Sequence, residues 1–155
     1  MKTINGIAAA AGIAIAKVYE LKAPELSYEK KTVEDKEHEL NRLDDALQTS
    51  IGELEKIKEH TRKTIGEEQA EIFSAHLLIL NDPELINPIK DKINEGQIAE
   101  AALDEVTSSF IEMFESMDNE YMQERAADIR DVSRRVLAHL LGVQFPNPVL
   151  VDEEV

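Results

Sequence analysis

The stretch LNRLDDALQTSIGELEKI, residues 40–57, decides the class of fold. Its large apolar side chains recur at steps of three or four residues, which is the spacing of one face of an α-helix. They are Leu40, Leu43, Leu47, Ile51, Leu54 and Ile57. The pattern predicts an amphipathic helix of about eight turns. The Thr32 hydroxyl and Asp35 favour a start near Thr32, and Gly66 predicts the end.

The chain after Gly66 predicts a second helix over residues 67–80, which breaks at Asn81-Asp82-Pro83. Asp82 can cap a new helical piece that has Pro83 in its first turn. Pro88 removes one helical hydrogen bond, so we expect this piece to kink or to begin at Asn87.

Two longer helices are predicted over residues 98–117 and 120–141, the second after a cap at Asp118-Asn119 and before Gly142. Both have apolar residues at helical spacing. Because the connections are short, neighbouring helices should pack antiparallel. The sequence therefore predicts a mainly α, antiparallel four-helix-bundle-like domain.

The two ends of the chain have a different pattern. Residues 13–21 alternate between apolar and polar side chains, which favours a strand, and Val149-Leu150-Val151 predicts another strand after a Pro-rich linker at 145–148. We therefore expect the helical domain to be inserted into an incomplete α/β domain. The expected divisions are residues 1–22 for the first α/β segment, 23–143 for the helical domain, and 144–155 for the linker and returning strand.

Composition limits the possible partners. The 155 residues include 17 Lys and Arg against 32 Asp and Glu, for a formal charge of −15, and no cysteine. This charge repels nucleic acid and anionic membranes and attracts basic proteins. Residues 7–16 resemble a short signal peptide, but only one basic residue precedes them and they are mostly alanine. We therefore expect a cytoplasmic protein without nucleic-acid or membrane partners.

An acidic region around His76 is the candidate binding site. No Lys or Arg lies between Lys63 and Lys90, whereas acidic residues are frequent there. In the same region, residues 77–80 are four consecutive apolar positions, which cannot all face one core because successive helical side chains point about 100° apart. An apolar patch rimmed by one sign of charge is typical of a protein-binding site. The alternative is that the bundle or a neighbouring domain covers the whole run.

Aromatic, Met and Arg side chains near the start of the last helix extend this candidate, because such a mixture is typical of interface cores. The predicted protein-binding residues are Glu67, Glu68, Leu78, Ile79, Asp82, Glu84, Leu85, Met117, Tyr121, Met122 and Arg125.

No catalytic or metal-binding residue is predicted. Di-iron bundles need Glu-x-x-His pairs on facing helices, and only Asp35-x-x-His38 approximates one. Phosphate-binding glycine motifs and H-E-x-x-H are absent from the sequence. The other histidines, His60, His76 and His139, stand singly.

Several stretches resemble the N-terminal part of enzyme I of the bacterial phosphotransferase system, the phosphoenolpyruvate-protein phosphotransferase family. The matching stretches are residues 4–8 and 12–14, 66–68, 72–73 with His76, 82–85, and the longest and most specific, Met117-Asp118-Asn119-Glu120-Tyr121-Met122-Gln123-Glu124-Arg125-Ala126-Ala127-Asp128-Ile129-Arg130-Asp131. Ala10-Ala11 departs from the family, which usually has a Ser-Pro-like pair there.

The resemblance implies a phosphoryl-transfer enzyme of which this chain is the docking fragment. Family members pass a phosphoryl group from phosphoenolpyruvate, through their own histidine, to a histidine-containing phosphocarrier protein of sugar transport. The helical insert binds the carrier, and the flanking α/β domain holds the active histidine. That histidine lies in a Gly-Gly-Arg-Thr-Ser-His-like motif, which these 155 residues lack. The magnesium and phosphoenolpyruvate site belongs to a later domain.

The resemblance thus implies three things about this chain: no cofactor in the fragment, magnesium only in the parent enzyme, and the carrier and the remainder of enzyme I as partners. The alternative is a non-enzymatic helical scaffold that binds a basic protein.

Overall fold

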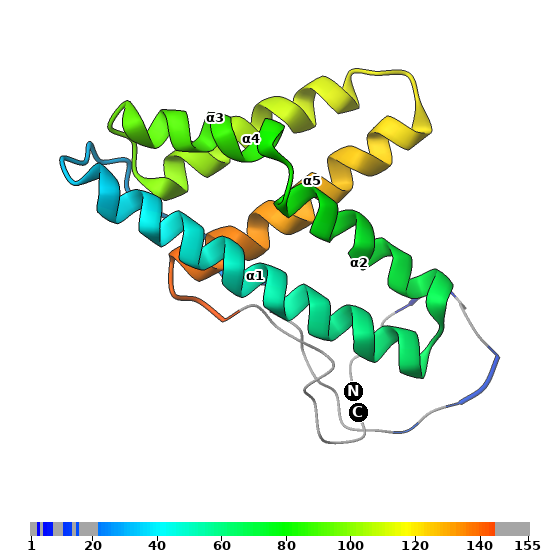
Figure 1. The fold of residues 1–155 in the computed structure, drawn as a ribbon. Helices are drawn as coiled ribbons and strands as arrows, with labels where there is room; N and C mark the ends of the chain where they lie inside the picture. The colour runs from blue at the N-terminus through cyan, green and yellow to red at the C-terminus, as the bar shows by residue number, and fades with distance from the viewer. Residues whose placement is uncertain (1–2, 4, 8–10, 14, 16–21, 145–155) are drawn as a thin grey trace.

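A computed structural model of the chain describes residues 3, 5–7, 11–13, 15 and 22–144, and this part contains five α-helices (Figure 1). They are α1 Lys36–Thr64, α2 Glu67–Leu80, α3 Pro83–Asn94, α4 Ala99–Glu115 and α5 Glu120–Leu140. The prediction of a mainly helical fold is confirmed, and the piece after Asp82 is a full helix of its own.

Side-chain caps fix three of the helix starts. The Asp35 carboxylate accepts a hydrogen bond from the His38 backbone N–H at 3.0 Å, and Asp82 accepts one from Glu84 N–H at 2.9 Å. Asn119 caps α5 in the same way. Each cap satisfies a backbone donor that has no partner within the helix. The expected start near Thr32 is wrong, because Asp35 supplies the cap and Thr32 forms an isolated β-bridge with Gln97.

Helix α3 begins at Pro83 and continues through Pro88, so of the two alternatives, a kink or a start at Asn87, the start at Asn87 is wrong. Pro83 lies in the first turn, where the missing N–H costs nothing. Leu85, Ile89 and Ile93 recur every four residues and are all buried. Their burial stabilises the helix enough to offset the one hydrogen bond that Pro88 removes.

The helices form two antiparallel hairpins. Helix α1 turns back into α2 through Ile65 and Gly66, α4 turns back into α5 through residues 116–119, and α3 packs on α4 (Figure 1). Helix α5 also packs against α1 and α2, which joins the hairpins around one core. The core contains the expected stripe of α1, since Leu43, Leu47 and Leu54 are buried. The antiparallel bundle is therefore confirmed.

The predicted terminal strands lie mostly outside the described residues. Ile13 and Ile15 are described and have no strand structure, and residues 149–151 lie outside the described part. Within the described ranges, the only β-pairing is the bridge between Thr32 and Gln97. The α/β segments at residues 1–22 and 144–155 therefore stay predictions.

Candidate functional site

An acidic and apolar stripe runs along the outer side of α2. Glu68, Glu71, Ala75 and Leu78 follow one another at steps of three or four residues, so they share one side of α2. Asp82 continues this spacing just beyond the end of the helix, where it caps α3. We call these five residues the α2 stripe. All except the half-buried Ala75 are exposed, and the Leu78 side chain is 67% exposed. A large aliphatic side chain is thus presented to solvent among carboxylates.

A second group of exposed apolar side chains lies where α4 turns into α5. Met113, Met117 and Tyr121 are exposed, and Arg125 is half-buried one turn after Tyr121. We call these four residues the α4–α5 corner. Between residues 22 and 144, the other exposed large apolar side chains are Ile65, Ile72 and Leu78, on or next to α2. Between residues 22 and 144, the exposed large apolar side chains therefore lie either on or next to α2 or at the α4–α5 corner.

His76 connects the helices that carry these two groups. Its Nε2 lies 3.2 Å from an oxygen of Asp128 on α5, and the Phe73 ring meets the imidazole edge-on. The His76 residue is buried, in contrast to the acidic residues around it in the sequence. Its contacts hold α2 against α5, so the histidine supports the surface without forming part of it.

Two predicted binding residues are in the core, so the expectation that they reach the surface is wrong. Ile79 is 9% exposed and Leu85 is 5% exposed, and both belong to the main hydrophobic cluster. In the run Leu77–Leu80, the helical rotation turns Ile79 and Leu80 inward and only Leu78 outward. Leu85 lies in the first turn of α3, on the same buried row as Ile89.

The remaining predicted residues are on the surface. Glu67, Glu68, Leu78, Asp82, Glu84, Met117 and Tyr121 are exposed, while Met122 and Arg125 are half-buried. Asp82 also caps α3. The predicted residues on the surface therefore lie on α2, at the start of α3 and at the α4–α5 corner, and α2 packs against α5.

The family assignment follows from a profile match. Residues 5–125, most of the chain, match the family described as "PEP-utilising enzyme, N-terminal". The chain belongs to this family. Among curated relatives, it is 66% identical to "Phosphoenolpyruvate-protein phosphotransferase" of Priestia megaterium over 99% of this chain, and 59% identical to the protein of that name from Bacillus subtilis (strain 168) over 100%. The chain spans 27% of the length of each relative.

Solved structures agree with this assignment. The chain matches a solution structure of "Enzyme I (nEIt)" with a TM-score of 0.79 and 37% identity, over 86% of this chain and 55% of that one. It also matches the "N-terminal domain of Enzyme 1 - Nitrogen" with a TM-score of 0.70 and 27% identity, over 77% and 50% of the two chains.

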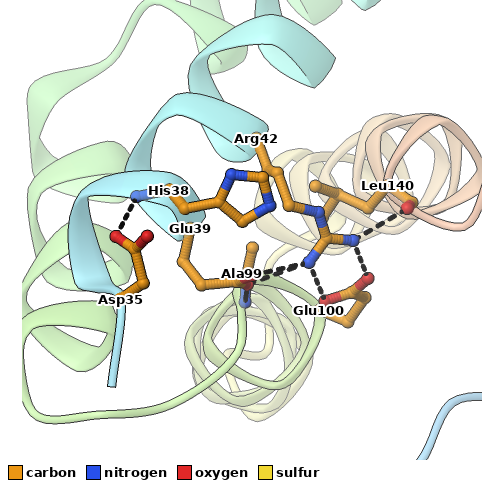
Figure 2. A network of polar contacts seen from close by, with 7 residues as sticks. All are labelled: Asp35, His38, Glu39, Arg42, Ala99, Glu100 and Leu140. Atoms are coloured by element: carbon orange, nitrogen blue, oxygen red, sulfur yellow. Dashed lines mark hydrogen bonds and ion pairs between the residues drawn. The ribbon is translucent and has the colours of Figure 1, made fainter. Parts of the chain in front are cut away.

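This member of the PEP-utilising family contains a buried ionic network that the sequence reasoning missed. Arg42 donates hydrogen bonds to the Glu39 carboxylate at 2.9 Å, to Glu100, and to the Leu140 carbonyl at 3.0 Å (Figure 2). Glu39 also accepts from the Ala99 N–H at 2.8 Å. The pKa of Arg42 is raised above its ordinary value, mainly by its hydrogen bond with Glu100.

The network has a structural role. Ile98 offers no side-chain cap to α4, so Glu39 takes that place, and Arg42 satisfies a carbonyl at the end of α5. The local signal was the Glu39-x-x-Arg42 spacing, which places the two side chains one turn apart. The partners on α4 and α5 had no signal in the sequence.

The other titratable side chains in the described part of the chain form no candidate metal site. Within the described ranges, no three His, Cys, Asp or Glu residues lie together in a way that would hold a metal ion. His139 pairs with Glu53 at 3.0 Å, while His38 and His60 are exposed. No helix in the described part is both long and apolar enough to cross a membrane.

Proposed function

We propose that the α2 stripe and the α4–α5 corner dock the histidine-containing phosphocarrier protein within a phosphoenolpyruvate-protein phosphotransferase. The observation that carries the proposal is Leu78, a 67%-exposed aliphatic side chain between acidic residues on a helix without any Lys or Arg. Exposed apolar surface with a rim of one charge sign is typical of protein interfaces. The name that the relatives share is the reason for proposing this enzyme, and the family resemblance is the reason for proposing the phosphocarrier protein as the partner.

Charge supports a basic partner. Glu68, Glu71, Asp82 and Glu84 are exposed, and they form no ion pair with a basic residue in the described part of the chain. Their field is therefore available to steer a basic surface into place. Such charges act mainly on the association rate and on orientation, whereas desolvated contacts determine the dissociation rate.

Apolar side chains supply the contact area. Leu78 on α2 and Met117, Tyr121 and Met122 on the other hairpin can be removed from water by a partner. Tyr and Met are enriched at interface cores, and a tyrosine buries a large area at modest entropic cost. A non-enzymatic scaffold for a basic protein would use the same surface, but the named relatives favour the enzyme.

The catalytic steps belong to other parts of the parent enzyme in this proposal. The 155 residues contain no Gly-Gly-Arg-Thr-Ser-His-like motif, so by themselves they should take no phosphate from phosphoenolpyruvate. Magnesium and phosphoenolpyruvate would bind elsewhere in the parent, and this stretch needs no cofactor. The proposal retains the expected cytoplasmic location.

A matched pair of charge reversals tests the proposal. The carrier is titrated into the chain by calorimetry, with Glu71→Lys as the test and Glu55→Lys as the control. Both glutamates are exposed on helices, but Glu55 lines a surface of α1 beside Lys56. Glu71→Lys should weaken binding on the order of tenfold at low salt, and Glu55→Lys should change it little. Absence of binding, or equal effects of the two variants, would refute the assignment of this face.

A further inference from the structure

Tyr121 and Arg125 form a pair on the first turns of α5. The Arg125 Nη2 donates a hydrogen bond to the Tyr121 hydroxyl at 3.2 Å, and the guanidinium carbon lies 5.5 Å from the centre of the Tyr121 ring. The two residues are four apart, so they lie on one side of the helix. Tyr121 is 57% exposed, which places the pair at the surface of the α4–α5 corner.

Arg125 differs from most arginines of the described chain because its hydrogen-bond partner, the Tyr121 hydroxyl, is uncharged. Arg42, Arg62, Arg130 and Arg135 each contact at least one carboxylate. In residues 22–144, no carboxylate lies within ion-pair distance of Arg125. Asp128, three residues further along α5, is instead engaged by His76. Within residues 22–144, the Arg125 guanidinium therefore forms no ion pair, although the protein has a formal charge of −15.

We propose that Tyr121 is a positioning residue that holds the Arg125 guanidinium ready for an anionic oxygen group of the docked carrier. This inference rests on the proposed docking function. A guanidinium has five N–H donors, and the Tyr121 hydroxyl uses one. The others fit the paired oxygens of a carboxylate or a phosphoryl group.

An uncharged hydrogen-bond partner can order the Arg125 side chain without neutralising its charge. A carboxylate would also fix the side chain, but it would neutralise the charge and compete for the same donors. The Tyr121 ring and hydroxyl limit the motion of Arg125 while leaving its charge available to the partner. Ordering the side chain before binding reduces the entropy lost on association, and this raises affinity without a new contact.

A double-mutant cycle separates positioning from direct contact. Binding of the carrier is measured by calorimetry for the unchanged chain, Tyr121→Phe, Arg125→Met and the double variant. Tyr121→Phe keeps the ring and removes only the hydroxyl, so it should weaken binding about three- to tenfold, the effect of one net hydrogen bond. In the Arg125→Met background, the same change should have almost no effect, because there is no guanidinium to hold.

The oxygen group is identified by repeating the cycle with the carrier phosphorylated on its histidine. A larger Arg125→Met effect with the phosphorylated carrier assigns the phosphoryl group, and equal effects with both forms assign a carboxylate of the carrier. Thermal melts should be nearly the same for all four proteins, since Tyr121 is exposed and Arg125 is only half-buried.

Two results would overturn the inference. A loss from Tyr121→Phe that persists in the Arg125→Met background would mean that the hydroxyl contacts the carrier itself. Normal binding by both single variants would mean that Tyr121 and Arg125 are not part of the interface. If a Leu78→Ala variant then bound the carrier weakly, the proposed docking function would still be supported. Failure of the unchanged chain to bind would refute the docking function, and the inference with it.

Discussion

Replacing Arg42 with methionine removes the one cation shared by two buried carboxylates. The side chains of Glu39 and Glu100 are 6% and 7% exposed, and both contact the Arg42 guanidinium. Methionine retains much of the volume of the arginine stem but none of its donors. The variant therefore leaves two carboxylates away from water without a charged partner, and it also leaves the Leu140 carbonyl without its donor.

The expected loss is large because removing one partner of a buried ion pair costs about 3–5 kcal/mol in free energy of unfolding. For a chain of this size, 1 kcal/mol lowers the melting temperature by roughly 2–4 °C, so the variant should melt about 6–20 °C lower. Chemical denaturation followed by far-ultraviolet circular dichroism measures the free energy, and a thermal scan measures the melting temperature.

Arg62→Met is the matched control on the same helix. Arg62 pairs with Glu59 at the same three-residue spacing, but both side chains are nearly half exposed. Exposed ion pairs contribute at most about 1 kcal/mol, so the control should lose little stability. The double variant Arg42→Met with Glu100→Leu should recover part of the loss, because one of the stranded charges is gone. If Arg42→Met were no less stable than Arg62→Met, the network would not fix the ends of α4 and α5.

Three further predictions follow from burial, pKa and charge. Leu85→Ala should cost about 2–5 kcal/mol, as a buried leucine does, whereas Leu78→Ala should stay within about 0.5 kcal/mol; equal melting curves would contradict the core assignment of Leu85. Burial and the hydrogen bond to Asp104 raise the pKa of Tyr28 from 10.0 to about 12. The stability from this contact should therefore be complete below pH 10 and lost as the pH rises through about 12. Difference titration of the phenolate against Tyr28→Phe measures the midpoint, and Asp104→Asn should lower it. Association with the carrier, followed by stopped flow, should slow as the screening length falls from roughly 30 to 8 Å between low and physiological salt; a rate that ignores salt would leave the acidic residues without a steering role.

Helix positions were largely predictable because their signals are local. The row of Leu43, Leu47 and Leu54 predicted the buried side of α1, and Asp82 and Asn119 marked the starts of α3 and α5. A cap or a periodic stripe depends on residues within one or two turns, so the sequence contains the whole signal. The start of α1 was misplaced because both Thr32 and Asp35 are good caps, and the contact of Thr32 with Gln97 involves a distant residue.

The candidate site was predictable only in outline. The absence of basic residues between Lys63 and Lys90 identified α2 and its neighbourhood, and the mixture of Met, Tyr and Arg identified the start of α5. Which member of the run Leu77–Leu80 faces solvent depends on how α2 is rotated against α1 and α5. Packing of the hairpins sets that rotation, and it turned Ile79 inward and Leu78 outward.

By itself, the sequence determined that this protein is an acidic helical bundle, where its helices run, and to which family it is similar, because periodicity, caps and motifs are properties of short segments. Only the tertiary structure decided which acidic residues are buried. Arg42 meets Glu100 and Leu140 across 58 and 98 residues of chain, so no local pattern distinguishes Glu39 and Glu100 from the exposed glutamates. Within residues 22–144, tertiary packing also leaves Arg125 without a carboxylate partner, because Asp128, one turn away, pairs with His76 on another helix.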